Sequence, residues 1–293
     1  MIAAGDGAGD PDRLRAMIDR RALLGLAAAL ALPATAARAE DEIAYGEGPD
    51  RRLDVHGRPG LSGAPVLVYV HGGGWRRGDK RMVHDLPEYA RRHGLLLVSV
   101  NYRMAPQVDA GGCAEDVAAA VAWVRTNIAR YGGDPARIFV SGHSAGAHLA
   151  ALIAIDRQYL GVHGVDPATL AGIVTIDGAG YDAVAQMAWL KDRQVLLSSM
   201  YENAFGARAA ELSPTLLVKA GQAYPPFLIF HIASRPDAQR QSNGLADALR
   251  AAGGQAEVVV APGDSHRSIN VEFGSAGDAE GERAAVFLTS GAL

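Results

Sequence analysis

The residues best suited to chemistry surround Ser144, in the sequence Gly142-His143-Ser144-Ala145-Gly146. This G-x-S-x-G pattern follows the apolar run Arg137–Val140 and opens the helical stretch Ala145–Asp156, so it lies at a predicted strand-to-helix junction. A sharp turn between small residues at such a junction exposes one hydroxyl group. The start of a helix also favours negative charge nearby, because its first N–H groups have no partner within the helix. Ser144 is therefore the predicted nucleophile, and the alternative interpretation is a helix cap.

A serine hydroxyl is a weak nucleophile near neutral pH and needs a base that a third group orients. The sequence "APGDSHRSIN" supplies His266 just after the last apolar run, Ala256–Val260. A histidine in a polar loop is more often a surface residue, but its place after the final strand makes His266 the best of the nine histidines. His266 is therefore the predicted base.

The predicted acid is Asp237, in "FLIFHIASRPDAQRQS". It follows the apolar run Pro226–Ile232 and a turn, and it opens the helical stretch Asp237–Ala252. Its alternative interpretation is a helix N-cap, a role that aspartate often has. Asp264 is the other nearby acid, but so close to His266 in the chain its side chain is expected to point elsewhere. The resulting chain order, serine then aspartate then histidine, is the order found in α/β-hydrolases.

Three consecutive glycines in "YVHGGGWRRG" follow the apolar run Pro65–Val70. Glycine loses more conformational entropy on folding than any other residue, so the triplet indicates either a flexible loop or a sharply turned one. Attack by a serine on a carbonyl group creates an oxyanion, which needs preorganised N–H donors. The predicted donors are the backbone N–H groups of Gly73, Gly74 and Ala145.

Short apolar runs alternate with helical stretches from residue 42 onward. The apolar runs are Pro65–Val70, Leu95–Val100, Arg137–Val140, Leu170–Ile176, Pro226–Ile232 and Ala256–Val260. The helical stretches are Pro87–His93, Cys113–Tyr131, Ala145–Asp156 and Asp237–Ala252. Arg51–Val55 is predicted as an earlier, antiparallel strand. Buried strands separated by helices favour an α/β fold with a mostly parallel, doubly wound sheet, which binds ligands at the carboxyl ends of its strands.

Residues 180–225 interrupt this alternation and predict a small cap inserted between two strands. Its aromatic residues could line a site for an aromatic group or form the small core of the insertion. These residues are Tyr181, Trp189, Tyr201 and Phe205. We therefore expect one hydrolase-like domain over residues 40–293, with the cap at about 180–225.

Composition bounds the class of protein. The chain has 293 residues, of which 49% are hydrophobic, and this is enough for one large core. Its net charge of −4 argues against a nucleic-acid-binding protein, which would be strongly basic. Cys113 is its only cysteine, so an intramolecular disulfide and a cysteine-rich metal site are excluded.

The first 39 residues have the layout of a targeting segment. Arg20 and Arg21 precede the apolar run Ala22–Leu32, which is too short to span a bilayer, and Ala37–Ala39 forms an A-x-A cleavage site. This layout predicts a secretory signal, and the arginine pair resembles a twin-arginine signal. We therefore expect an exported, periplasmic or secreted protein with no membrane segment in its mature form. The alternative is an apolar helix packed on the domain of a cytoplasmic protein.

These motifs together resemble the α/β-hydrolase esterases with an HGGG loop, which are related to the hormone-sensitive lipase group. Within them, the chain is most similar to a bacterial branch of feruloyl-esterase-like and kynurenine-formamidase-like proteins. The similarity extends over residues 42–293 and rests on "VHGGGWRRGDK", "VSVNYRMAP", "NIARYGGDPARIFVSGHSAGAHLAAL", "DGAGYD", "ASRPDAQRQS" and "SHRSIN". The acid loop departs from the lipase group, because it lacks the usual D-P-L turn.

The resemblance implies an α/β-hydrolase fold and a serine hydrolase without a cofactor or a metal. It implies a catalytic triad of Ser144, Asp237 and His266, with oxyanion donors at Gly73, Gly74 and Ala145. The main hypothesis is a carboxylesterase whose partner is a small acyl or aryl ester. The alternative is an amidase that deformylates N-formylkynurenine, and the remote alternative is a hydrolase fold kept as a non-catalytic binding module.

Overall fold

The computed structural model describes residues 1–2, 40–191 and 193–293. The predicted signal sequence and its cleavage site therefore lie outside the described residues. From residue 40 onward, the chain builds one eight-stranded sheet in the order β1-β2-β4-β3-β5-β6-β7-β8. The strands are β1 (Glu40–Ala44), β2 (Arg52–His56), β3 (Ala64–Val70), β4 (Leu96–Val100), β5 (Gly133–His143), β6 (Gly172–Ile176), β7 (Phe227–Ile232) and β8 (Ala256–Ala261).

The six strands from β3 to β8 pair in parallel. Only β2 runs against its neighbours, because it pairs antiparallel with both β1 and β4. The helices are α1 (Leu86–His93), α2 (Ala110–Asn127), α3 (Ala145–Ile155), α4 (Arg157–Gly161), α5 (Ala183–Leu190), α6 (Val195–Phe205), α7 (Pro214–Leu217), α8 (Pro236–Ala251), α9 (Ser268–Val271) and α10 (Ala279–Ser290). The predicted α/β fold with a mostly parallel sheet is confirmed.

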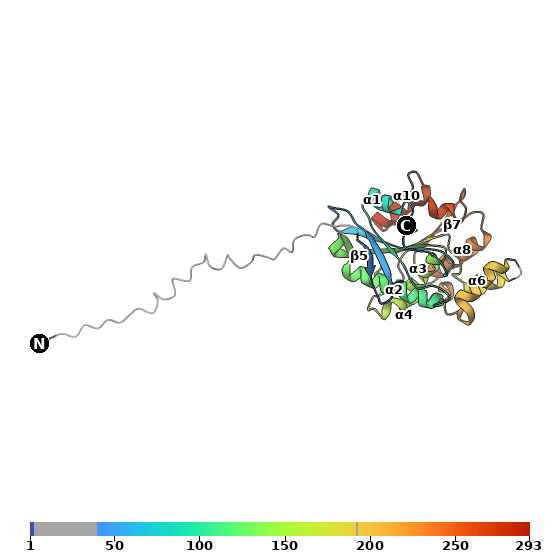
Figure 1. The fold of residues 1–293 in the computed structure, drawn as a ribbon, viewed down its shortest axis with the longest axis horizontal. Helices are drawn as coiled ribbons and strands as arrows, with labels where there is room; N and C mark the ends of the chain where they lie inside the picture. Colours follow the sequence, from blue (N-terminus) through green and yellow to red (C-terminus); the bar gives the residue numbers. More distant parts are fainter. Residues whose placement is uncertain (3–39, 192) are drawn as a thin grey trace. The chain divides into compact units, whose positions relative to one another are not determined.

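Both faces of the sheet are covered by helices, as the continuous apolar strands require. Successive side chains of a strand point to opposite faces, so alternate residues of β3 enter different cores. Val66, Val68 and Val70 belong to the core under α2, α3 and α8, whereas Leu67 and Tyr69 belong to the core under α1 and α10. Figure 1 shows α1 and α10 on one side of the sheet and α2 and α4 on the other.

Every predicted apolar run became a strand, and every predicted helical stretch contains a helix, with shifts of a few residues at the ends. The short helices α4 and α9, strand β1 and helix α10 were missed. Strand β1 has the sequence EDEIA, whose charged residues suit an exposed edge strand and give no clear alternation. Helix α10 lies beyond the last catalytic motif; its N-cap is Asp278, whose side chain accepts a hydrogen bond from the Gly281 N–H group.

The segment between β6 and β7 contains α5, α6 and α7, in the region where the sequence predicted a cap. Three of the four aromatic residues considered for the site, Tyr181, Tyr201 and Phe205, are at most 5% exposed. The rings of Tyr201 and Phe205 pack edge-on against Trp75, with centroids 5.2 and 4.9 Å away. These aromatic side chains therefore form a core beneath the insertion rather than the lining of a cavity. Among the described helices, none has the length and apolar character needed to cross a bilayer.

Candidate active site

Ser144 lies in the sharp turn between β5 and α3, where the sequence predicted it. Its backbone has a φ of +55°, a conformation that is strained for a residue with a side chain. The turn is held by a hydrogen bond from the Ser144 N–H group to the Ile176 carbonyl of β6, at 3.0 Å. A Cβ atom on Gly146 would lie 2.1 Å from the Val70 carbonyl oxygen, so only glycine allows α3 to start this close to β3. The turn therefore presents the serine side chain at the carboxyl edge of the sheet.

His266, in the loop after β8, reaches this hydroxyl. Its Nε2 atom lies 3.1 Å from Ser144 Oγ. The neighbouring His143 helps to place the loop, because its Nε2–H donates to the His266 carbonyl at 2.9 Å and the two rings lie 4.5 Å apart. Burial, and then the nearby His266, lower the pKa of His143 to about 3, so His143 is a neutral donor at neutral pH. The structure thus brings the predicted nucleophile and base into hydrogen-bond contact.

The acid beside His266 is Asp177, not the predicted Asp237. His266 Nδ1 lies 2.6 Å from Asp177 Oδ2, and the Asp177 side chain is completely buried. Asp177 is the first residue after β6, the strand next to the one that ends at the nucleophile. A usable sequence signal existed, because "TIDGAGYD" places an aspartate directly at the end of an apolar run.

Asp237 faces a different set of partners. It lies in the first turn of α8, where its Oδ2 atom accepts hydrogen bonds from Arg235 Nη2 at 3.0 Å and from Gln186 Nε2 at 3.2 Å. Strand β7 ends at Ile232, and the intervening turn carries the chain past the imidazole before Asp237 is reached. The correction follows from this geometry: Asp237 is separated from His266 by the guanidinium group of Arg235.

Arg235 is the residue that sequence reasoning missed at this site. Its Nη1 atom lies 2.7 Å from Asp177 Oδ2 and 2.8 Å from His266 Nδ1. Burial by itself would lower the pKa of Arg235, but the charges of Asp177 and Asp237 outweigh it and raise the pKa. A guanidinium group can only donate hydrogen bonds. Arg235 therefore competes with Asp177 for the same imidazole nitrogen, since Nδ1 donates to the carboxylate but would accept from the arginine.

The glycine-rich loop after β3 comes close to the serine from the other side. Gly73 has a φ of +125°, and a Cβ atom there would lie 1.9 Å from the Arg77 carbonyl oxygen, so this turn requires glycine. The N–H groups of Gly73 and Gly74 donate no hydrogen bond to any described residue. Ala145 is the first residue of α3, so its N–H group has no acceptor within the helix. Gly73 and Gly74 line the same cavity as Ser144, and Ala145 is the residue directly after the serine.

The loop is fixed by its aromatic neighbours. The ring of His71 stacks on Tyr102 with centroids 4.4 Å apart, and the Tyr102 hydroxyl donates to the His71 carbonyl at 2.8 Å. The indole Nε1–H of Trp75 donates to His148 Nδ1 at 3.3 Å. The three consecutive glycines therefore form a rigid, sharply turned loop, because the residues on both sides of them are held by these contacts.

A cavity of about 910 Å³ opens in front of Ser144 and His266. The glycine-rich loop, α6 and the segment from His266 to Val271, which includes α9, form its walls. Over residues 40–191 and 193–293, no three histidine, cysteine or carboxylate side chains gather closely enough to hold a metal ion. Cys113 is buried away from the cavity, and burial raises the pKa of its thiol to about 12. The cavity is lined by the hydroxyl group of Ser144 and the imidazole of His266.

Comparison with known proteins gives a consistent result. A family model described as alpha/beta hydrolase fold matches residues 67–270. Esterase LipQ of Mycobacterium tuberculosis is 34% identical over 230 residues, which is 72% of this chain and 53% of the relative. Isoprenylcysteine alpha-carbonyl methylesterase ICME of Arabidopsis thaliana is 30% identical over 241 residues, which is 78% of this chain and 56% of the relative.

Solved structures agree on the fold. A thermophilic esterase from Thermogutta terrifontis superposes with a TM-score of 0.64 over 87% of this chain and 91% of that chain, at 23% identity. At that identity the likeness concerns the fold alone. The chain spans about half the length of the curated relatives it matches.

Proposed function

The chain belongs to the α/β-hydrolase fold family, and from this we propose that it is a serine carboxylesterase acting on small acyl or aryl esters. The observation that carries the proposal is the unbroken contact from Ser144 Oγ to His266 Nε2, and from His266 Nδ1 to Asp177 Oδ2, at 3.1 and 2.6 Å. The named esterases among its relatives support an ester as the substrate.

In the first half of the proposed reaction, His266 Nε2 takes the proton of the Ser144 hydroxyl as Oγ attacks the ester carbonyl carbon. The carbonyl π bond opens and its electron pair becomes an oxyanion, which the N–H groups of Gly73, Gly74 and Ala145 stabilise. Collapse of this intermediate breaks the bond to the alcohol, which leaves with the proton held by His266. An acyl group then remains on Ser144.

In the second half, water attacks the acyl carbon while His266 takes its proton. The carboxylic acid leaves as Ser144 Oγ recovers a proton from His266. Throughout both halves, Asp177 accepts a hydrogen bond from Nδ1–H and so keeps the Nε2 lone pair directed at the serine. The acid thus comes from the loop after β6, and Asp237 has no direct part in this scheme.

The test is hydrolysis of p-nitrophenyl acetate, p-nitrophenyl butyrate, methyl ferulate and N-formylkynurenine by the protein and by Ser144→Ala. We expect turnover of the esters, and a loss of about 10⁴-fold or more in kcat on removal of the nucleophile. A fluorophosphonate probe should label Ser144, as peptide mass spectrometry can check.

Ser62→Ala is the matched control, because Ser62 is an exposed serine before β3, at the opposite edge of the sheet. It should keep full activity. Preference for N-formylkynurenine over every ester would replace the esterase with the amidase. Folded protein that neither hydrolyses a substrate nor reacts with the probe would contradict the proposal as a whole.

A further inference from the structure

The cavity in front of Ser144 has an uneven distribution of charge. Arg76 and Arg77, in the loop after β3, and Arg267, next to the base, all line it. Among the described residues, no aspartate or glutamate lines this cavity. The whole chain, in contrast, has more acidic than basic residues, with 32 Asp and Glu against 28 Lys and Arg. Composition therefore does not explain why cations border this one space.

The guanidinium groups of these three arginines also have no partner among the described residues. Within the described part of the chain, none of their guanidinium groups makes an ion pair or a side-chain hydrogen bond, whereas Arg103 binds Asp116 at 2.8 Å and Arg208 binds Asp109 at 2.7 Å. A guanidinium group has a planar set of N–H donors that matches a carboxylate or a phosphate. Unpaired arginines around a cavity are thus free to bind an anionic ligand.

The opposite wall of the cavity is apolar. Helix α6 contributes Leu196, Leu197 and Met200, of which Leu196 is 88% exposed. An exposed leucine on one helix is ordinary, but here three apolar side chains of one helix line the same cavity as Ser144. A ligand that fills the cavity would therefore meet cations on one side and apolar side chains on the other.

We propose that the substrate is an amphiphilic ester that carries a negatively charged group, a carboxylate or a phosphate, in addition to the ester bond. The charged group binds Arg77 and Arg267, and the apolar part lies on α6. This inference rests on the proposed esterase function and names the substrate class of the same site. It also gives a role to Arg77, the second of the two arginines that directly follow the glycine-rich motif.

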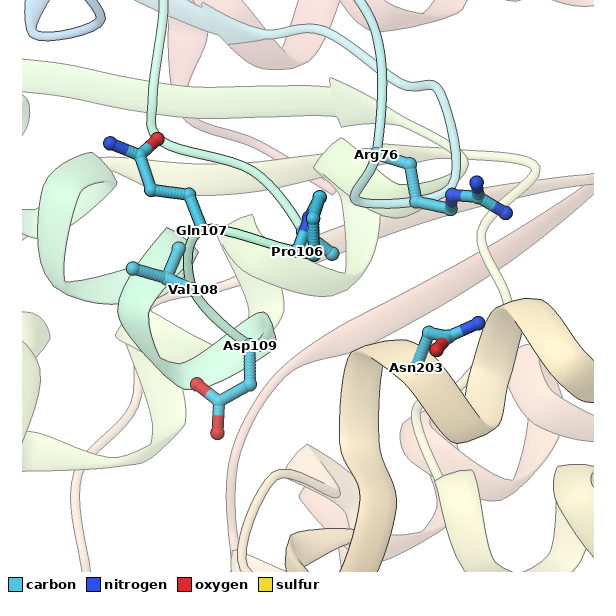
Figure 2. A pocket seen from close by; sticks show the side chains of 7 residues that line it. Arg76, Pro106, Gln107, Val108, Asp109 and Asn203 are labelled. Carbon is cyan, nitrogen blue, oxygen red and sulfur yellow. The ribbon is translucent and has the colours of Figure 1, made fainter.

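Arg76 has a second environment. It also borders a smaller neighbouring cavity of about 460 Å³, with Gln107 and Asn203. In Figure 2, Arg76 and Asn203 lie on one side of that cavity, across from the chain segment that carries Pro106 and Gln107. Arg77 and Arg267 line the cavity that contains Ser144 and do not border this smaller one, so they are the residues to test first.

The test compares kcat/KM for matched anionic and neutral esters. On the acyl side the pair is p-nitrophenyl hemiglutarate and p-nitrophenyl pentanoate; on the alcohol side it is 4-acetoxybenzoate and 4-acetoxybenzamide. Spontaneous hydrolysis is subtracted with Ser144→Ala. In at least one pair, we expect kcat/KM for the anionic ester to exceed kcat/KM for the neutral ester by about tenfold or more, as one charge-assisted contact provides. The preference should fall as NaCl rises from about 0.05 to about 0.5 M, because salt screens exposed charges.

Arg77→Gln and Arg267→Gln should each reduce the preference for the anionic ester in kcat/KM. The double variant should reduce it by about tenfold or more. Their side chains are exposed, so the variants are expected to fold. Arg58→Gln is the matched control, because Arg58 is an exposed arginine in the loop before β3 and does not line the cavity. It should leave the preference and its salt dependence unchanged.

The outcomes separate the two proposals. Hydrolysis of neutral esters without any anionic preference overturns the substrate class while the esterase stands. A preference that survives in the double variant overturns the assignment to these arginines. No hydrolysis of any ester by folded protein means that the proposed function itself has failed. Where the anionic preference is found, inhibition of p-nitrophenyl butyrate hydrolysis by benzoate and by phenyl phosphate is compared. The stronger inhibitor identifies a carboxylate or a phosphate as the preferred group.

Discussion

At the scale of single residues, the state of Asp177 decides whether the imidazole can act as a base. Burial by itself raises the pKa of a carboxyl group, but the hydrogen bond with His266 and the charge of Arg235 outweigh it at Asp177, whose pKa is lowered. The Ile232 N–H group also donates to Asp177 Oδ1 at 3.2 Å. Asp177 is therefore an ionised acceptor at neutral pH, as orientation of the His266 tautomer requires.

Replacement of the two candidate acids separates their roles. Asp177→Asn should lower kcat for p-nitrophenyl butyrate by about 10³- to 10⁴-fold, because an amide can donate to Nδ1 and hold the wrong tautomer. Asp237→Asn is the matched variant and should cost less than about tenfold, since Asp237 contacts Arg235 and not the imidazole. Equal losses of kcat in the two variants would contradict the assignment of Asp177 as the acid.

Arg235 should control the pH range of activity. Its positive charge lies 2.7 Å from Asp177 Oδ2 and helps to hold the pKa of that carboxyl group below its ordinary value. In Arg235→Gln that charge is absent, so Asp177 becomes protonated at higher pH and the acidic limb of the pH profile of kcat/KM moves upward. Arg235→Lys keeps the charge and should keep the wild-type profile. An unchanged profile in Arg235→Gln would rule out this positioning role.

At the scale of elements, the sheet places the serine and the acid with little help from loops. The β5–β6 register pairs His143 with Ile176, so the residues that directly follow, Ser144 and Asp177, emerge side by side from adjacent strands. Ladder hydrogen bonds fix that spacing. Only His266 comes from a longer loop, and the hydrogen bond from His143 to its carbonyl holds it. An acid directly after β6 is therefore held more rigidly than Asp237, the fifth residue after β7, would be.

A second link between elements passes through His148. Its Nδ1 atom accepts from Trp75 in the glycine-rich loop, and its Nε2–H donates at 2.8 Å to the Leu212 carbonyl in the segment between β6 and β7. This arrangement requires a neutral ring with its proton on Nε2. Burial lowers the pKa of His148 to about 4, and the hydrogen bond to Leu212 only partly offsets it.

This link should make the fold sensitive to acid. The folded pKa lies below the ordinary value, so the unfolded chain binds a proton first as the pH falls below about 6.5, and stability falls until about pH 4. Between about pH 7 and about pH 5 the contribution is about 2 kcal/mol in the free energy of unfolding. Urea unfolding of His148→Gln should show a smaller loss over this interval than the wild type.

The exposed His163 gives the control, because His163→Gln should lose as much stability on acidification as the wild type. Equal pH dependence in His148→Gln and the wild type would show that His148 does not carry this effect.

At the scale of the whole molecule, the sequence allowed the fold to be predicted because apolar runs mark buried parallel strands directly. The serine turn and the glycine-rich loop were also predictable, since each requires residue types that few other structures need. The acid was not, because an aspartate follows β6 and another follows the turn after β7, and the order serine, aspartate, histidine holds for both. The prediction took the second, which follows the strand before the last one. The choice depends on the position of a third side chain, Arg235, between Asp237 and His266, which no pattern in the sequence encodes.

The arginines around the cavity have a consequence for the end of each catalytic cycle. Hydrolysis turns an ester group into an acid that ionises at neutral pH, so every turnover creates a new anion next to Ser144. Arg77 and Arg267 would attract that product at least as strongly as its parent ester. Departure of the product, and not bond cleavage, would then limit the rate, and accumulated acid would slow the enzyme that makes it.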